Sequence, residues 1–161
     1  MRIALDAMGG DHAPGELVKG AVEAVNRLGT EIILVGDKET LEKELSSYAY
    51  PQDKILIQHA SQVVEMHEQA TVALRKKRDS SIVVATMLAK EGKADAVVSC
   101  GNTGAQMAAA LFILGRFEGI DRPPIPAVIP GFNSKTILLD IGANVDVKPE
   151  QLVQFAVLGQ A

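Results

Sequence analysis

The stretch Arg2–Gly36 (RIALDAMGGDHAPGELVKGAVEAVNRLGTEIILVG) carries the pattern that decides the fold. Its two ends, Arg2–Ala7 and Glu31–Gly36, are short apolar runs of the kind that form buried strands. Between them, Pro14–Leu28 repeats apolar residues at helical spacing. Five of these share one face of the expected helix: Leu17, Val18, Ala21, Val22 and Val25. A strand, a helix and a second strand in this order predict two parallel strands joined by a crossover helix.

The same alternation continues along the chain. Further strands are expected at Lys54–His59, Ala94–Ser99, Ile125–Ile129 and Thr136–Asp140. Further helices are expected from Asp37 to about Tyr48, from Val63 to about Lys77, at Ser80–Glu91, from about Thr103 to Phe117 and from Lys148 onward. Strands that are continuous apolar runs separated by helices belong to a sheet covered on both faces. The sequence therefore predicts an α/β fold, a three-layer α/β/α sandwich with a mainly parallel sheet.

The composition excludes several classes of protein. The 161 residues are 47% hydrophobic and 22% charged, as in a folded globular domain rather than a disordered chain. A formal net charge of −4 argues against nucleic-acid binding. Even the apolar run that includes Ala108–Leu114 is far shorter than the roughly 20 residues of a membrane span. The single cysteine excludes an internal disulfide and favours a reducing compartment such as the cytoplasm.

The C-terminal segment predicts that the chain is the N-terminal part of a longer protein. Pro149 suits the first turn of a helix, and Gln151–Ala161 (QLVQFAVLGQA) then continues apolar without a terminating charge. Five residues of this segment need a surface to bury against: Leu152, Val153, Phe155, Ala156 and Leu158. We therefore expect residues 1–161 to be part of a larger α/β/α protein that is cut within a helix near residues 150–161.

Three loops rich in glycine and small polar residues follow predicted strands. Loop one is Asp6–Pro14 (DAMGGDHAP), loop two is Ser99–Ala105 (SCGNTGA) and loop three is Asp140–Asp146 (DIGANVD). Loops that follow parallel strands meet at the carboxyl edge of the sheet, where α/β proteins bind ligands. Glycine lets the backbone approach a ligand closely, and the N–H groups that open a following helix suit an anion. Loop two suits phosphate best because it carries no charge, but Asn102 and Thr103 are equally suited to capping a helix.

Four aspartates in loops one and three allow two interpretations, since bare carboxylates would repel a dianionic phosphate at close range. Asp6, Asp11, Asp140 and Asp146 could hold Mg²⁺, which would make the protein a magnesium-dependent phosphotransferase or phosphohydrolase. Alternatively, Asp11 and Asp146 cap helices, while Asp6 and Asp140 orient loop backbone or a base. We favour this second interpretation.

Other candidate residues lie in and around these loops. His12 could contact phosphate or shuttle a proton near neutral pH. Cys100 precedes a helix, where a thiol can become a nucleophile, but a small buried residue at a strand end is the favoured interpretation. The basic run Arg75–Arg78 is either a solvated face or a patch that steers an acidic partner. Arg122 is a candidate anion ligand.

Five motifs resemble those of the bacterial phosphate acyltransferases of phospholipid synthesis, the PlsX family. They are Leu5–Pro14 (LDAMGGDHAP), Lys77 with Asp79-Ser80-Ser81, Ser99–Ala105 (SCGNTGA), Arg122-Pro123 and Leu139–Ala156 (LDIGANVDVKPEQLVQFA). The resemblance extends in register over the whole chain. Members of the family are about twice as long, so it implies that only the N-terminal half is present. One departure is Cys100, where relatives commonly carry Ala, and this argues against a thioester-forming nucleophile.

The resemblance implies an enzyme that transfers a fatty acyl group from acyl carrier protein to inorganic phosphate and so forms an acyl phosphate. It implies a fold similar to that of phosphotransacetylases and isocitrate-dehydrogenase-like proteins. It further implies a homodimer, no metal or organic cofactor, and a cytoplasmic enzyme with peripheral membrane contact through the missing half. As an isolated half, the chain is expected to bind phosphate with little or no activity.

The chemistry of this reaction predicts a division of roles among the loop residues. A phosphate oxygen must attack a thioester carbonyl, which requires alignment and stabilisation of the developing oxyanion. The predicted phosphate-binding residues are Gly9, Gly10, Ser99, Gly101, Asn102, Thr103, Gly104 and Arg122. His12 is expected to contact phosphate or protonate the departing thiolate, and Asn144 to donate to the carbonyl oxygen. Asp140 completes the predicted catalytic set.

Overall fold

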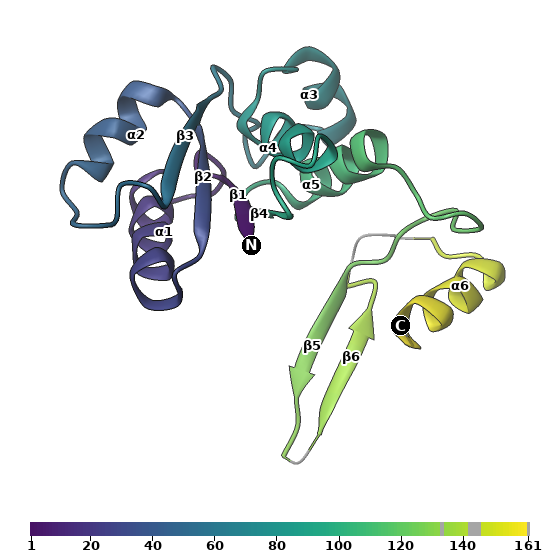
Figure 1. Ribbon diagram of the computed structural model, residues 1–161. Coiled ribbons are helices and arrows are strands. Elements are labelled where there is room, and N and C mark those ends of the chain that lie inside the picture. Colours follow the sequence, from purple (N-terminus) through teal and green to yellow (C-terminus); the bar gives the residue numbers. More distant parts are fainter. Residues whose placement is uncertain (133, 142–145, 161) are drawn as a thin grey trace. The chain divides into compact units, whose positions relative to one another are not determined.

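A computed structural model of the chain describes residues 1–132, 134–141 and 146–160. The elements in chain order are β1 (Arg2–Asp6), α1 (Gly15–Leu28), β2 (Glu31–Gly36), α2 (Lys38–Leu45), β3 (Ile55–His59), α3 (Ala70–Lys76), α4 (Ser81–Lys90), β4 (Ala96–Ser99), α5 (Thr103–Ala109), the π-helical turn η1 (Ala110–Leu114), β5 (Pro126–Pro130), β6 (Lys135–Leu139) and α6 (Pro149–Gln160) (Figure 1). They form two compact units, Met1–Leu114 and Gly115–Ala161, which are described separately below.

The first unit is built on a sheet of four parallel strands in the order β3-β2-β1-β4. Strand β1 lies in the middle, with Leu5 opposite Leu34 of β2 on one side and opposite Val98 of β4 on the other. Because β1 and β4 are neighbours and parallel, their carboxyl ends, Asp6 and Ser99, are also opposite each other. The fold thus brings loop one and loop two to the same place on the sheet edge.

Helices cover both faces of this sheet, because successive residues of a strand point to opposite sides. On one face, Leu5, Ile32 and Leu34 are buried against α1 and α2. On the other face, the alternate residues Ala4, Ile33 and Val35 are buried in a second cluster with residues of α4. Figure 1 shows α1 and α2 on one side of the strands and α4 on the other. The predicted α/β/α sandwich with a mainly parallel sheet is confirmed.

In its described residues, the second unit holds a two-stranded antiparallel ladder and one helix. Strands β5 and β6 pair with Val128 opposite Ile137, outside the four-stranded sheet. We expected these two strands to continue the parallel sheet, and for this pair the expectation is wrong. Only the four residues 131–134 separate the strands, and so short a connection permits a hairpin but no crossover to a parallel neighbour. Helix α6 packs on β6, and its Phe155 is buried.

Two helices differ from the expected ranges. Residues 63–69 do not form the start of a helix, and α3 begins only at Ala70. Helix α5 passes directly into η1, and η1 ends at Leu114 because Gly115 takes a positive φ of 94° that leaves the helical region. Among the residues that the structure describes, no helix is long and apolar enough to cross a membrane.

Candidate functional site

Loops one and two meet through their glycines. A Cβ atom added to Gly9 would lie 3.1 Å from Gly101 Cα, and one added to Gly101 would lie 3.0 Å from Gly9 Cα. Gly10 has a φ of 116°, and a Cβ atom there would lie 3.0 Å from the carbonyl oxygen of Cys100. Any larger residue at these positions would force the loops apart. The predicted meeting of these two loops at the carboxyl edge is thus confirmed by their backbone contact.

Asp6 links loops one and two through hydrogen bonds. The residue is 3% exposed, and its carboxylate accepts hydrogen bonds from Ser99 Oγ at 2.8 Å and from the amide of Met8 at 3.3 Å. Ser99 Oγ in turn accepts a hydrogen bond from the amide of Gly101 at 3.1 Å. Asp6 therefore orients loop backbone, which is the role that we favoured for it. In the described part of the chain, no three Asp, Glu, His or Cys side chains form a group that could hold a metal ion.

Three successive backbone amides of loop two are available to an anion. The amide of Gly101 donates to Ser99, and that of Ala105 donates to Asn102 Oδ1 at 2.9 Å. Between them, the amides of Asn102, Thr103 and Gly104 have no acceptor among the described residues, as is usual at the start of a helix. Thr103 and Gly104 are exposed, so an anion can reach these donors from solvent.

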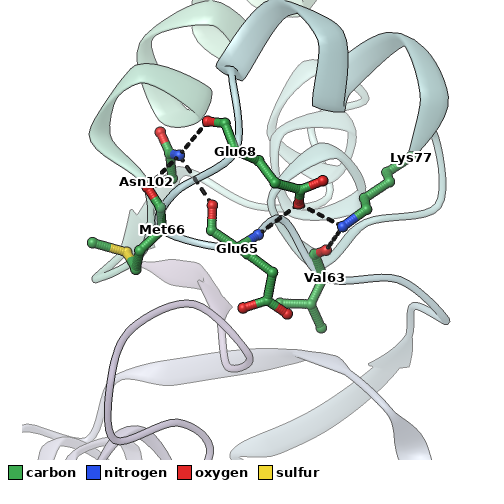
Figure 2. Close-up of polar contacts among 6 residues, drawn as sticks. All are labelled: Val63, Glu65, Met66, Glu68, Lys77 and Asn102. Carbon is green, nitrogen blue, oxygen red and sulfur yellow. Dashed lines mark hydrogen bonds and ion pairs between the residues drawn. The ribbon is translucent and has the colours of Figure 1, made fainter.

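The side chain of Asn102 forms hydrogen bonds with backbone groups of the protein through both its oxygen and its nitrogen. Its Oδ1 caps α5 through Ala105, and its Nδ2 donates to the carbonyl oxygens of Glu65 and Met66 at 3.1 Å and of Glu68 at 3.0 Å (Figure 2). The sequence allowed Asn102 either a capping or an anion-binding role. The structure gives its side chain the capping role, and a direct contact between this side chain and phosphate stays a prediction.

An ion pair beside Asn102 was missed by the sequence reasoning. The carboxylate of Glu68 accepts hydrogen bonds from Lys77 Nζ and from the amide of Glu65, the latter at 2.8 Å (Figure 2). The hydrogen bond from Lys77, followed by that from the Glu65 amide, holds the pKa of Glu68 below its usual value. Glu68 is therefore ionised at neutral pH. Its isolated carboxylate gave no signal in the sequence, because its partner is nine residues away and beyond a helix.

The basic run Arg75–Arg78 is exposed to solvent except at Lys77, which is partly buried. Lys77 turns inward to Glu68, whereas Arg75 and Arg78 line a mainly apolar pocket of about 520 Å³. Helices α3, α4 and α5 and the turn η1 all contribute to this pocket, and its apolar lining includes Leu74, Met87 and Phe112. The side chain of Phe112 is 67% exposed. Two cationic side chains therefore border an apolar hollow.

The remaining predicted residues of the first unit lie at the surface. His12 is exposed two positions after Gly10, and in the described part of the structure its ring forms no hydrogen bond with loop two. Asp11 is also exposed. Cys100 is exposed, so the expectation of a buried residue at the strand end is wrong. Its position is explained by loop packing, since the backbone of Cys100, not its side chain, faces Gly10 most closely.

The other predicted residues belong to the second unit. Asp140 follows β6 with a φ of 63°, and its amide donates to the carbonyl of Ile125 at 2.9 Å. Arg122 is exposed. Asn144 lies outside the described residues, as does most of loop three. The predicted approach of Asp140, Asn144 and Arg122 to the first two loops stays a prediction.

A four-stranded parallel sheet with helices on both faces and glycine loops at its carboxyl edge defines an α/β/α protein. The chain is similar to the solved structure of EutD phosphotransacetylase from Staphylococcus aureus, with a TM-score of 0.65 and 19% sequence identity. This likeness covers 98% of the present chain and 51% of the other. At this identity it concerns the fold alone, and it agrees with the fold expected from the motifs.

The chain belongs to the family of fatty acid synthesis proteins, which matches residues 1–161. It is 57% identical over 162 residues to the phosphate acyltransferase of Syntrophomonas wolfei, covering 99% of this chain and 51% of the relative. It is 57% identical over 159 residues to the phosphate acyltransferase of Desulforamulus reducens, covering 99% and 47%. The chain thus spans about half the length of these relatives. The family resemblance drawn from the motifs is confirmed.

Proposed function

We propose that the full-length protein that contains this chain transfers a fatty acyl group from an acyl carrier protein thioester to inorganic phosphate. The observation that carries the proposal is the 57% identity to relatives named phosphate acyltransferase over 99% of this chain. Because the chain spans about half of these relatives, we assign the activity to the full-length protein and propose that residues 1–161 are its N-terminal part. The magnesium-dependent alternative is not favoured by these relatives.

The geometry of loop two supports this reaction. Phosphate would accept hydrogen bonds from the amides of Asn102, Thr103 and Gly104, which have no other acceptor in the described structure. Held there, one phosphate oxygen attacks the thioester carbonyl, so that a C–O bond forms and the C–S bond breaks. The thiolate of the carrier leaves and takes up a proton, for which His12 is the proposed donor. The negative charge on the carbonyl oxygen needs a donor, and Asn144 is proposed for it.

The reaction is tested with the full-length protein, a fatty acyl carrier thioester and inorganic phosphate. We expect release of the carrier thiol to require phosphate and to be matched by formation of acyl phosphate, with the rate unchanged by EDTA. Thiol release that does not depend on phosphate would show hydrolysis instead. Activity that EDTA abolishes and Mg²⁺ restores would support the metal-dependent alternative.

We further propose that the acidic carrier protein docks at the pocket bordered by Arg75 and Arg78. The exposed apolar lining and the two guanidinium groups would meet an acidic surface that has an apolar centre. A homodimer and peripheral membrane contact, which the family resemblance implied, are part of the same proposal for the full-length protein.

Charge reversal at this pocket tests the docking site. Arg78→Glu is expected to raise the KM for the acyl carrier thioester about tenfold at low salt, a loss of about 1.4 kcal/mol. The effect should shrink as salt rises, since exposed charges are screened over about 10 Å at 0.1 M. Lys76→Glu is the matched control, because it makes the same charge change at an exposed residue outside the pocket. Equal effects of the two variants would exclude docking at this pocket.

A further inference from the structure

The segment 63–69, between β3 and α3, has no regular secondary structure but is held at several points (Figure 2). Val64 is buried in a cluster that includes Ala105 of α5. Three carbonyl groups of the segment, those of Glu65, Met66 and Glu68, converge on the single Nδ2 atom of Asn102. The start of α5 is thereby fastened to a segment more than thirty residues earlier in the chain.

Glu68 takes part in this arrangement twice. Its carbonyl accepts from Asn102, while its carboxylate accepts from the amide of Glu65 and from Lys77 Nζ. Lys77 Nζ also donates to the carbonyl of Val63 at 2.6 Å. The ammonium group of Lys77 therefore binds the segment near its start, at Val63, and near its end, at Glu68. Both side chains of the ion pair are only 27% exposed. A partly buried pair of this kind is screened less by dissolved salt than a surface pair is.

These hydrogen bonds form one network that ends at loop two. Its members are Val63, Glu65, Met66, Glu68, Lys77 and Asn102. Its last member, Asn102, caps α5 and precedes the amides of Thr103 and Gly104. A Cβ atom added to Gly104 would lie 3.3 Å from Ala70 Cβ, so the start of α3 also touches loop two. If the segment 63–69 moved, Asn102 would lose its three acceptors and the surface that supports Gly104 would shift.

We infer that Lys77 and Glu68 are positioning residues that hold the three free amides of loop two in the geometry that binds the reacting anion. This inference rests on the proposed function, which places phosphate at these amides. Lys77 acts through Glu68 and Asn102 and does not itself touch the substrate. The charge of Lys77 matters because, without it, an ionised Glu68 would be left half-buried and unpaired.

This last point separates positioning from direct binding of phosphate by Lys77. In Lys77→Met, the unpaired carboxylate of Glu68 pushes the segment out of place. In the double variant Lys77→Met/Glu68→Gln that carboxylate is neutral, and the glutamine oxygen can still accept from the amide of Glu65. The double variant should therefore recover much of the function. If Lys77 bound phosphate, removing the charge of Glu68 would restore nothing.

The experiment measures the phosphate KM, kcat and amide hydrogen exchange of the full-length protein and its variants. For Lys77→Met we expect a phosphate KM raised about tenfold, a smaller change in kcat, and faster exchange of the hydrogen-bonded amides of Glu65 and Ala105. For the double variant we expect a KM within about threefold of that of the wild type, about 0.6 kcal/mol. Lys76→Met, an exposed neighbour outside the network, should change neither property.

Three outcomes would overturn the inference. A raised phosphate KM with unchanged exchange of the Glu65 and Ala105 amides would mean that Lys77 contacts the substrate. A double variant no better than Lys77→Met would show that the unpaired carboxylate is not the cause. Faster exchange with an unchanged phosphate KM would place phosphate away from loop two, with the network intact as a structural feature. The proposed function itself fails only if the wild-type protein forms no acyl phosphate.

Discussion

Gly9→Ala in the full-length protein is expected to raise the phosphate KM at least about tenfold and to lower the melting temperature. The new methyl group would lie 2.5 Å from Asp6 Oδ2 and 3.1 Å from Gly101 Cα, closer than van der Waals contact allows. Neither neighbour can move easily, because Asp6 is buried and hydrogen-bonded and Gly101 is backbone. Overpacking of this kind destabilises proteins by about 1–3 kcal/mol, and here it acts on the loop that we propose binds phosphate.

Gly20→Ala is the matched control for this prediction. Gly20 lies within α1, and a Cβ atom there would meet nothing within 4 Å. The same change should stabilise the protein by about 1 kcal/mol through helix propensity and leave the phosphate KM unaltered. Phosphate titrations of the initial rate and thermal melts of both variants give the comparison. If Gly9→Ala kept the wild-type phosphate KM, the contact between loops one and two would have no part in binding the substrate.

The sheet of the first unit could be read from the sequence because its strands are buried on both faces. Glu31–Gly36 is a continuous apolar run, and its predicted range is the observed one. In such a strand, alternate residues enter two separate cores, so no alternation with polar residues remains to blur the pattern. The same strength of pattern misled us at β5 and β6. Apolar runs identify strands, but the partner of a strand also depends on the length of the connection, and the short connection between β5 and β6 makes them antiparallel.

The candidate site was readable only where it depends on topology. That loops one and two meet follows from two parallel neighbours with glycine after each, and the sequence contains both facts. The roles of Asn102 and Glu68 depend on contacts with residues 63–69, which we expected to be helical. In a helix those carbonyl groups would have bonded to amides of their own segment. Because residues 63–69 were expected to be helical, their carbonyl groups could not be predicted as partners of Asn102.

Asp6→Ala is expected to lower the stability of the full-length protein by about 2 kcal/mol or more. Hydrogen bonds to a charged group contribute about 1.5–3 kcal/mol, and the substitution removes the acceptor of both Ser99 Oγ and the Met8 amide. Ser99 would then be free to turn, and the amide of Gly101 would lose its fixed acceptor. Denaturant unfolding should show the loss, and the cycle with Ser99→Ala should give a coupling energy of about 0.5–3 kcal/mol.

Asparagine variants decide between the two interpretations of the aspartates. Asp6→Asn keeps an oxygen that can accept from Ser99 Oγ, so it should retain most of the stability and activity that Asp6→Ala loses. Asp11→Asn changes an exposed carboxylate on the same loop and should have almost no effect. A magnesium site predicts the opposite result, because both asparagine variants would then lose a charged metal ligand and with it the activity. The loss of activity and stability in Asp6→Asn, compared with that in Asp6→Ala, therefore distinguishes two roles of this buried carboxylate. A small loss indicates a hydrogen-bond acceptor for the two loops, and a complete loss indicates a metal ligand.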